Sequence, residues 1–173
     1  MPNAAIEEHS QAVNNYKPTH PTYFRVVRQG SPGEFSSKLV AERVFPKGSV
    51  IAALEGLTAG EKRYSSVQIN ESEHVELNSD LLYMNHSCDP SALMDVDNMA
   101  VTAAKDIEAG DEITFFYPST EWDMAQPFSC WCGSPKCVQI VQGAQHLPSE
   151  VLKQFQLSTH ISKLVARRDA KSS

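Results

Sequence analysis

Apolar residues in this chain come mostly in short runs that are rich in β-branched and aromatic side chains. Such runs predict β-strands, because these side chains favour a pleated and half-buried backbone. Turn-forming segments separate them, for example Pro46-Lys47-Gly48 and Glu108-Ala109-Gly110-Asp111. The predicted strands are Tyr23–Val27, Lys38–Ala41, Val50–Leu54, Val67–Ile69, Met99–Ala103 and Ile113–Phe116. This spacing predicts a mainly β fold built from several small sheets with short helices.

The pattern changes at both ends of the chain. Residues 148–168 are predicted to form a C-terminal helical segment, because apolar residues recur at helical spacing after Pro148-Ser149-Glu150 and again after Ser158-Thr159. Their apolar faces fit either packing onto the core or the contact of a homodimer. Residues 1–21 end in Lys17-Pro18-Thr19-His20-Pro21 and are predicted to be a mobile or partly helical leader.

Length and composition narrow the class of protein. A chain of 173 residues with 41% hydrophobic residues is expected to form one globular domain with a real core. No segment approaches the roughly 18 consecutive apolar residues of a membrane span, and the N-terminus lacks the apolar run of a signal peptide. We therefore expect a soluble, intracellular protein without a membrane partner.

The net charge of −6 bears on the binding partners. Nucleic-acid surfaces rely on clustered Lys and Arg, and the main cluster here lies at the C-terminus, so direct sequence-specific nucleic-acid binding is not expected. An acidic protein surface favours binding of a basic peptide. The alternative explanation is that the negative charge only keeps the protein soluble.

All four cysteines fall into two motifs. Cys130, Cys132 and Cys137 lie within eight residues, and Cys88 lies in Asn85-His86-Ser87-Cys88-Asp89-Pro90. A structural zinc ion takes four thiolate or imidazole ligands in a tetrahedron, and three can come from one tight turn. Zinc is the favoured interpretation, with a redox-active thiol cluster and disulfides as alternatives. Disulfides are the weakest of these, because cysteines so close in sequence pair only with strain.

The order and spacing of three motifs resemble those of a known family. The motifs are Asn85–Ser91, Gly110-Asp111-Glu112 running on to Tyr117, and the Cys-x-Cys-Gly-x-x-x-Cys segment. Together they are similar to the SET-domain protein lysine methyltransferases with a post-SET zinc segment. The resemblance implies a SET domain over residues 22–118, a post-SET segment over 128–143, and a pseudoknot that brings the Asn-His loop against the strand before Tyr117.

The resemblance also implies an activity and a set of site residues. The implied activity is methyl transfer from S-adenosylmethionine to the side chain of a lysine in a protein, and a basic histone tail is the expected substrate. Tyr117 corresponds to the catalytic tyrosine, and Tyr83 and Phe115 to the walls of the lysine channel. Phe rather than Tyr at position 115 implies di- or trimethylation. The implied cofactor contacts are Asn85, His86, Lys38 and Leu39, and the implied zinc ligands are Cys88, Cys130, Cys132 and Cys137.

Other interpretations of these residues remain open. Asn85 and Asp89 fit ordinary turn chemistry, and Tyr117 and Phe115 fit packed positions of a core strand. A second function class is a catalytically silent SET-fold module that binds peptides, either alone or as a dimer. A thiol enzyme using Cys88 and His86 is disfavoured, since two residues apart on one loop is a poor geometry for proton transfer. A histone substrate implies a location in the nucleus, or in both nucleus and cytoplasm.

Overall fold

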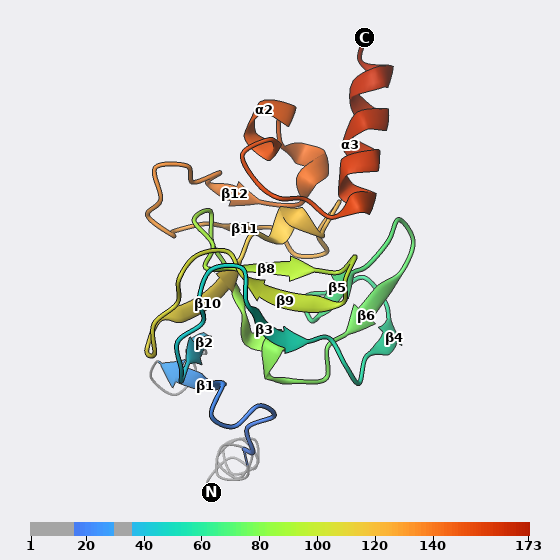
Figure 1. The fold of residues 1–173 in the computed structure, drawn as a ribbon. Helices are drawn as coiled ribbons and strands as arrows, with labels where there is room; N and C mark the ends of the chain where they lie inside the picture. The colour runs from blue at the N-terminus through green and yellow to red at the C-terminus, as the bar shows by residue number, and fades with distance from the viewer. Residues whose placement is uncertain (1–15, 30–35) are drawn as a thin grey trace, which may run out of the picture.

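The structure is a computed structural model that describes residues 16–29 and 36–173. It consists mostly of short strands in small sheets with a few short helices, which confirms the predicted fold class (Figure 1). The elements are β1 Phe24–Gln29, β2 Ser36–Ala41, β3 Val50–Ala53, β4 Thr58–Gly60, β5 Ser66–Gln68, β6 His74–Glu76, η1 Asp80–Tyr83, β7 Asn85–His86, β8 Ala92–Asp95, β9 Ala100–Ala103, β10 Glu112–Phe115, η2 Tyr117–Ser119, β11 Phe128–Ser129, β12 Ile140–Val141, η3 Ala144–His146, α2 Ser149–Leu152 and α3 Thr159–Lys171.

The first sheet carries the strands that position the predicted site. Its order is β1-β2-β10-β7, and β7 forms its edge. β10 pairs antiparallel with β2 but parallel with β7, with Thr114 opposite Asn85 and Phe115 opposite His86. The Asn-His motif therefore lies directly against the strand that leads into Tyr117, as the resemblance implied.

Two three-stranded sheets complete the central body, in the orders β3-β9-β8 and β4-β6-β5. Strands β4, β6 and β8 were not predicted, because each carries at most one β-branched residue. They form because neighbouring strands supply their partners, as β9 does for β8. The core between the sheets is apolar, and Phe24, Leu39 and Ile113 are fully buried in it.

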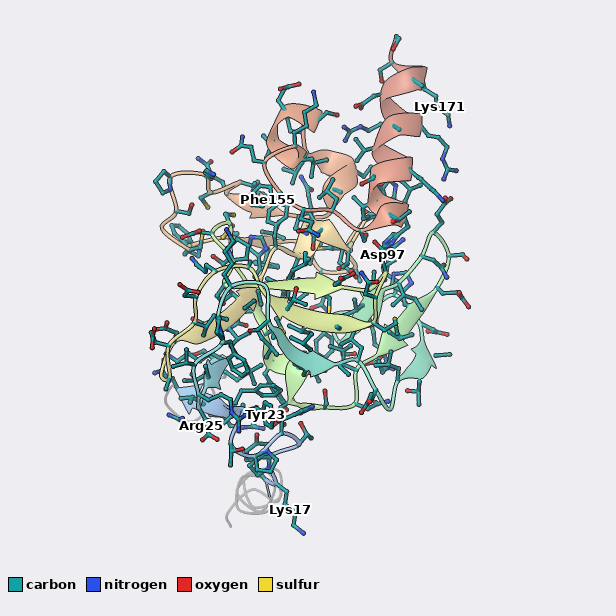
Figure 2. The ribbon with its side chains drawn as sticks, in the orientation of Figure 1. Lys17, Tyr23, Arg25, Asp97, Phe155 and Lys171 are labelled. Atoms are coloured by element: carbon teal, nitrogen blue, oxygen red, sulfur yellow. The ribbon has the colours of Figure 1, made fainter. Side chains whose placement is uncertain are left out.

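The C-terminal segment covers the body near η2. Leu152 of α2 and Ile161 of α3 are buried, and the Phe155 ring stacks on Phe116 with a centroid distance of 3.7 Å. Asp97, from the turn between β8 and β9, reaches the start of α3, where it accepts hydrogen bonds from the Thr159 amide (2.9 Å) and hydroxyl (3.0 Å) (Figure 2). The apolar residues of this segment thus pack within the chain. The last helix ends at Lys171, three residues beyond the predicted end.

Among the described residues, no helix is both long and apolar enough to cross a membrane.

Candidate functional site

Tyr117 begins η2 at the end of β10, and its side chain turns back into the body. The phenol donates a hydrogen bond to the Met84 carbonyl oxygen at 2.8 Å. The Phe115 ring lies 4.7 Å from the Tyr117 ring, and the Phe128 ring meets it edge-on at 6.0 Å. Burial, together with the nearby carboxyls of Glu121 and Glu112, raises the pKa of Tyr117 well above its ordinary value. The phenol therefore keeps its proton at neutral pH and can act only as a hydrogen-bond donor or acceptor.

Tyr117 and Phe115 line one cavity of about 260 Å³. Its other walls come from the segment before β5, from η1, and from residues 121–128. Leu77, Leu81 and Val67 supply buried apolar surface, and Tyr64 and Phe128 are exposed aromatic residues of its lining. A mainly apolar cavity lined by a tyrosine and a phenylalanine fits the methylene chain of a lysine.

Tyr83 occupies a different position from the one expected for a channel wall. Leu81 and Leu82 line the cavity, whereas Tyr83 does not belong to its described lining. The Tyr83 hydroxyl accepts a hydrogen bond from Arg28 at 3.5 Å, and the Arg28 guanidinium lies 5.7 Å from the centre of the ring. The side chain thus meets β1 in this structure, and its place in a lysine channel stays a prediction.

Asn85 is exposed at the edge strand β7. Its amide donates to the Ser37 carbonyl at 2.8 Å and to Glu112 Oε1 at 3.2 Å. Its Oδ1 accepts no hydrogen bond from the part of the chain that the structure describes, so it remains available to a donor from a ligand.

Both ring nitrogens of His86 are engaged within the protein. Nδ1 accepts the Tyr117 amide at 3.1 Å, and Nε2 lies 3.2 Å from Cys88 Sγ. Because Nδ1 accepts, the hydrogen sits on Nε2 and points at the sulfur. Burial lowers the pKa of His86 to about 4, so the ring is neutral at pH 7. His86 therefore connects the cysteine cluster to the start of η2, and neither ring nitrogen is left to bind a cofactor.

The two β2 residues predicted to contact the cofactor have different environments. Leu39 is fully buried in the core, paired with Val26 on one side and Ile113 on the other. Lys38 is only partly buried and pairs with Val27 of β1. Their predicted contacts with a cofactor stay predictions.

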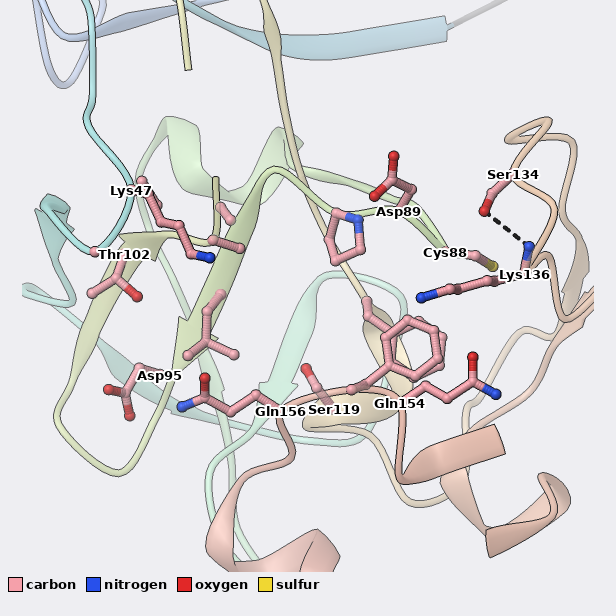
Figure 3. Close-up of a pocket in the computed structure, with 18 of the residues that line it drawn as sticks. Lys47, Cys88, Asp89, Asp95, Thr102, Ser119, Ser134, Lys136, Gln154 and Gln156 are labelled. Atoms are coloured by element: carbon pink, nitrogen blue, oxygen red, sulfur yellow. Dashed lines mark hydrogen bonds between the residues drawn. The ribbon is translucent and has the colours of Figure 1, made fainter. Parts of the chain in front are cut away.

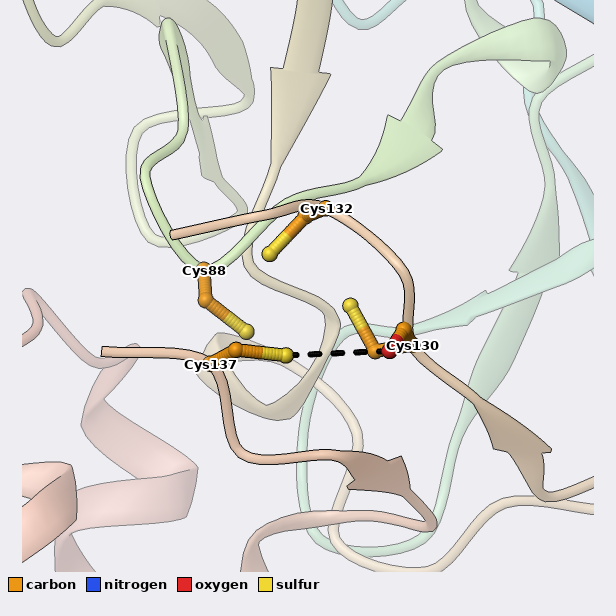
Figure 4. Close-up of side chains that lie close together, drawn as sticks. All are labelled: Cys88, Cys130, Cys132 and Cys137. Atoms are coloured by element: carbon orange, nitrogen blue, oxygen red, sulfur yellow. Dashed lines mark hydrogen bonds between the residues drawn. The ribbon is translucent and has the colours of Figure 1, made fainter. Parts of the chain in front are cut away.

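The four cysteines converge although Cys88 is distant in sequence from the other three (Figure 4). All are free thiols, and their sulfur atoms lie within 4.8 Å of one another. Tetrahedral zinc with Zn–S bonds of about 2.3 Å places its sulfurs about 3.8 Å apart, so modest movement would satisfy that geometry.

The surroundings of the sulfurs also fit a metal. The amides of Val138 and Gln139 donate to Cys88 Sγ and Cys137 Sγ, each at 3.4 Å. Such N–H donors stabilise thiolates. Burial raises the pKa of the Cys88 thiol far above its usual range, so a cation is needed to keep that sulfur ionised.

A second and larger cavity, of about 760 Å³, lies beside the Cys88 loop (Figure 3). It lies between the outer face of β8 and β9 and the connection from α2 to α3, where Gln154 and Gln156 project into it. Its described lining includes Cys88 but neither Tyr117 nor Asn85. The smaller cavity is therefore the one associated with the predicted chemistry.

Glu121 is a cavity residue that the sequence analysis did not identify. Its amide donates to the Tyr117 carbonyl at 3.0 Å, one turn along the chain, and its side chain lines the smaller cavity. A lone glutamate in Pro118-Ser119-Thr120-Glu121 carries no distinctive sequence signal. Only its nearness to Tyr117 could have pointed to it.

Comparison with known proteins assigns the class. A family model of the SET domain matches residues 6–118, and the chain belongs to the SET-domain family. It is a methyltransferase of that family. "Methyltransferase flvH" of Aspergillus flavus is 40% identical over 154 residues, covering 87% of this chain and 85% of that protein.

More distant relatives are much longer proteins. The H3 lysine-36-specific histone-lysine N-methyltransferase of Gibberella zeae is 27% identical over 119 residues, which cover 64% of this chain and 12% of that protein. Histone-lysine N-methyltransferase ash1 of Drosophila melanogaster is 26% identical over 120 residues, or 5% of its length. Among solved structures, KRYPTONITE in complex with mCHG DNA and SAH has a TM-score of 0.49 and 19% identity, covering 68% of this chain and 29% of that one.

Proposed function

We propose that this chain transfers methyl groups from S-adenosylmethionine to the side chain of a lysine in a protein, with a basic histone tail as substrate. The observation that carries the proposal is the cavity lined by Tyr117 and Phe115, at the point where β10 runs beside the Asn85-His86 strand. The choice of a histone as the substrate rests on the names of the distant relatives and on the acidic charge of the chain.

The cofactor supplies, when bound, a methyl group made electrophilic by a sulfonium. Asn85 would hold its amino-acid end through the unengaged Oδ1, and the backbone of β7 offers an open sheet edge beside it. The Tyr117 hydroxyl and the Met84 carbonyl would orient the target nitrogen, and the apolar walls would exclude water. Phe115 provides no hydroxyl to hold a water there, which leaves room for the di- or trimethyl product.

Zinc belongs to the same proposal as a structural ion. Cys88 would join the cofactor loop to the post-SET segment, residues 128–143, through a site closed by Cys130, Cys132 and Cys137. The segment contains only a two-residue strand pair, β11 with β12, so a metal would supply much of its order.

The proposed organisation is a SET domain over 22–118, the post-SET segment over 128–143 and the helical segment over 148–168. A histone substrate would place the protein in the nucleus. Because Leu152 and Ile161 are buried within the chain, a homodimer through the C-terminal helices would have to use other side chains of that segment.

The test is incubation with labelled S-adenosylmethionine and, in parallel, nucleosomes, free histones, a cell extract and free lysine. We expect label on one histone lysine, mapped by mass spectrometry, and no label with Tyr117→Phe. Label confined to other extract proteins would overturn the histone assignment, and label on free lysine alone would overturn the protein substrate. Absence of label from every arm, with histone peptides still bound, would favour the silent peptide-binding module.

A further inference from the structure

Glu121 presents a carboxylate to the cavity of Tyr117, and only neutral groups hold it. Its Oε2 accepts hydrogen bonds from the Gln68 amide at 3.1 Å and from the Thr120 hydroxyl at 2.6 Å. Gln68 also fixes the next residue, since its Oε1 accepts the Trp122 amide at 2.9 Å. The carboxylate is thus held in place at the wall of the cavity.

The other charged groups of this wall have partners of opposite charge. Lys62 contacts Asp123 at 2.8 Å, and Arg63 contacts Glu76 at 3.0 Å. Asp123 also meets His146 at 2.9 Å. Within residues 16–29 and 36–173, no cation forms an ion pair with Glu121. Of the carboxylates lining the cavity in that part of the chain, it alone has no such partner.

A carboxylate held away from water without a cation is costly, and a cation that enters its cavity is correspondingly stabilised. Burial raises the pKa of Glu121 to about 7, against the opposing hydrogen bonds from Thr120 and Gln68. A group with that pKa is well matched to exchange a proton at physiological pH. Methyl transfer needs such an exchange, because an ammonium has no lone pair and must become an amine first.

We propose that Glu121 binds the ammonium of the substrate side chain in the Tyr117 cavity and accepts one proton from it. The inference rests on the proposed function and adds the residue that prepares the amine. One N–H bond of the ammonium breaks and one O–H bond forms on the carboxylate, which leaves a neutral amine and a neutral carboxylic acid. The acid afterwards returns its proton to water.

Several titratable groups surround Glu121. Tyr117 lies in η2 and keeps its proton at neutral pH. His74 of β6 and His160 of α3 have pKa values lowered by burial, so both are neutral at pH 7. The remaining charged groups of the wall are the paired Lys62, Arg63 and Asp123. His146 of η3 also reaches this wall through its contact with Asp123 at 2.9 Å. A titration near pH 7 in this cavity is therefore assigned to Glu121 only if Glu121→Gln removes it.

The kinetic test compares wild type with Glu121→Gln and Glu121→Asp on the substrate mapped by labelling. The pKa of Glu121 is about 7, so its carboxylate forms as the pH rises through 7. We expect wild-type kcat/KM to rise through that region and Glu121→Gln to lose the rise. Its kcat/KM at pH 8 should be about 100-fold lower, in the range of a general base. Glu121→Asp should recover part of the loss, and Glu73→Gln, an exposed carboxylate on the adjacent hairpin, should match wild type.

A second readout needs no activity. Carboxyl carbon NMR of ¹³C-labelled protein should give a resonance that titrates near pH 7 and is absent from Glu121→Gln. Added n-butylammonium chloride should lower that pKa, because a cation favours the ionised carboxylate. An unchanged pH profile in Glu121→Gln, or a resonance indifferent to n-butylammonium, would overturn the inference.

The two readouts separate this inference from the proposed function. If no substrate is methylated but n-butylammonium still shifts the Glu121 resonance, the cation site stands and the methyl-transfer proposal fails. If methylation is robust and abolished by Tyr117→Phe, yet indifferent to Glu121→Gln at every pH, the proposed function stands and Glu121 is not its base.

Discussion

At the scale of single residues, the Tyr117 hydroxyl is held by the Met84 carbonyl at 2.8 Å rather than left free in the cavity. We predict that Tyr117→Phe lowers kcat by about 100-fold or more, because a positioned donor at the reacting centre is lost. Cofactor affinity should change little, as calorimetry can establish. The variant should lose only about 1 kcal/mol of unfolding free energy, the worth of one hydrogen bond. Full turnover in this variant would exclude a catalytic role for the phenol.

The second prediction concerns Phe115 and the number of methyl groups transferred. Its side chain is 6% exposed and lies against the Tyr117 ring, so an added hydroxyl would reach the same cavity. Phe115→Tyr should hold a water near the target nitrogen and shift the product from the di- or trimethyl state towards monomethyl. Mass spectrometry of the product over time is the measurement. An unchanged product distribution, in a variant that remains folded, would show that this position does not control the number of methyl groups.

Residues of the candidate site could be predicted where they belong to a sequence motif, and not elsewhere. The cysteine spacing predicted a cluster, and the cluster forms in the structure. Tyr117, predicted as catalytic, and Phe115, predicted as a channel wall, line one cavity, whereas Tyr83, the other predicted wall, does not belong to its described lining. Glu121 could not be predicted, because its position depends on the turn after η2 and on a hydrogen bond from Gln68, which lies in a distant strand. The sequence carries no sign of that tertiary contact.

At the scale of elements, β7 and β10 are joined by more than their strand pairing. His86 accepts the Tyr117 amide and directs its other nitrogen at Cys88, so one ring spans the strand, η2 and the cysteine cluster. The short strands β4, β6 and β8 show the limit of the sequence pattern, since each carries at most one β-branched residue and so no run that indicates a strand. Each forms by pairing with another short strand, β8 with β9, and β4 and β5 with β6.

The start of α3 gives an element-scale prediction. Ser158 precedes the helix, but its hydroxyl donates to the Ser119 carbonyl, and Asp97 of another turn caps the first helical amide instead. Asp97→Ala should therefore lower the unfolding free energy by about 1 kcal/mol. The melting temperature should fall by about 2–4 °C. Glu55→Ala, at an exposed position without an ion pair within the described chain, serves as the control. Equal melting temperatures for the two variants would contradict the capping role.

At the scale of the whole molecule, contacts between distant segments build the site. Cys88 meets Cys130, Cys132 and Cys137, and the segment that holds these three has little regular structure of its own. Its own backbone offers few hydrogen bonds, such as Cys130 N–H to the Gln139 carbonyl at 2.7 Å. A metal at the cluster would therefore decide whether the segment 128–143 packs against the Asn85-His86 strand.

The final prediction follows from this arrangement. Purified protein should contain about one zinc per chain by elemental analysis, and chelation should release it.

Cys130→Ser should lower both zinc content and thermal stability. It should also weaken cofactor binding, because His86 ties Cys88 to the amide of Tyr117 and a disordered cluster would loosen that strand end. Ser134→Ala, in the same turn but without a sulfur ligand, is the matched control. Loss of zinc should leave four reduced thiols. Cys88 should react most slowly with a thiol reagent, because it is buried and burial raises the pKa of its thiol, which keeps it protonated. A metal-free preparation with unchanged stability and unchanged cofactor affinity would reject the zinc site.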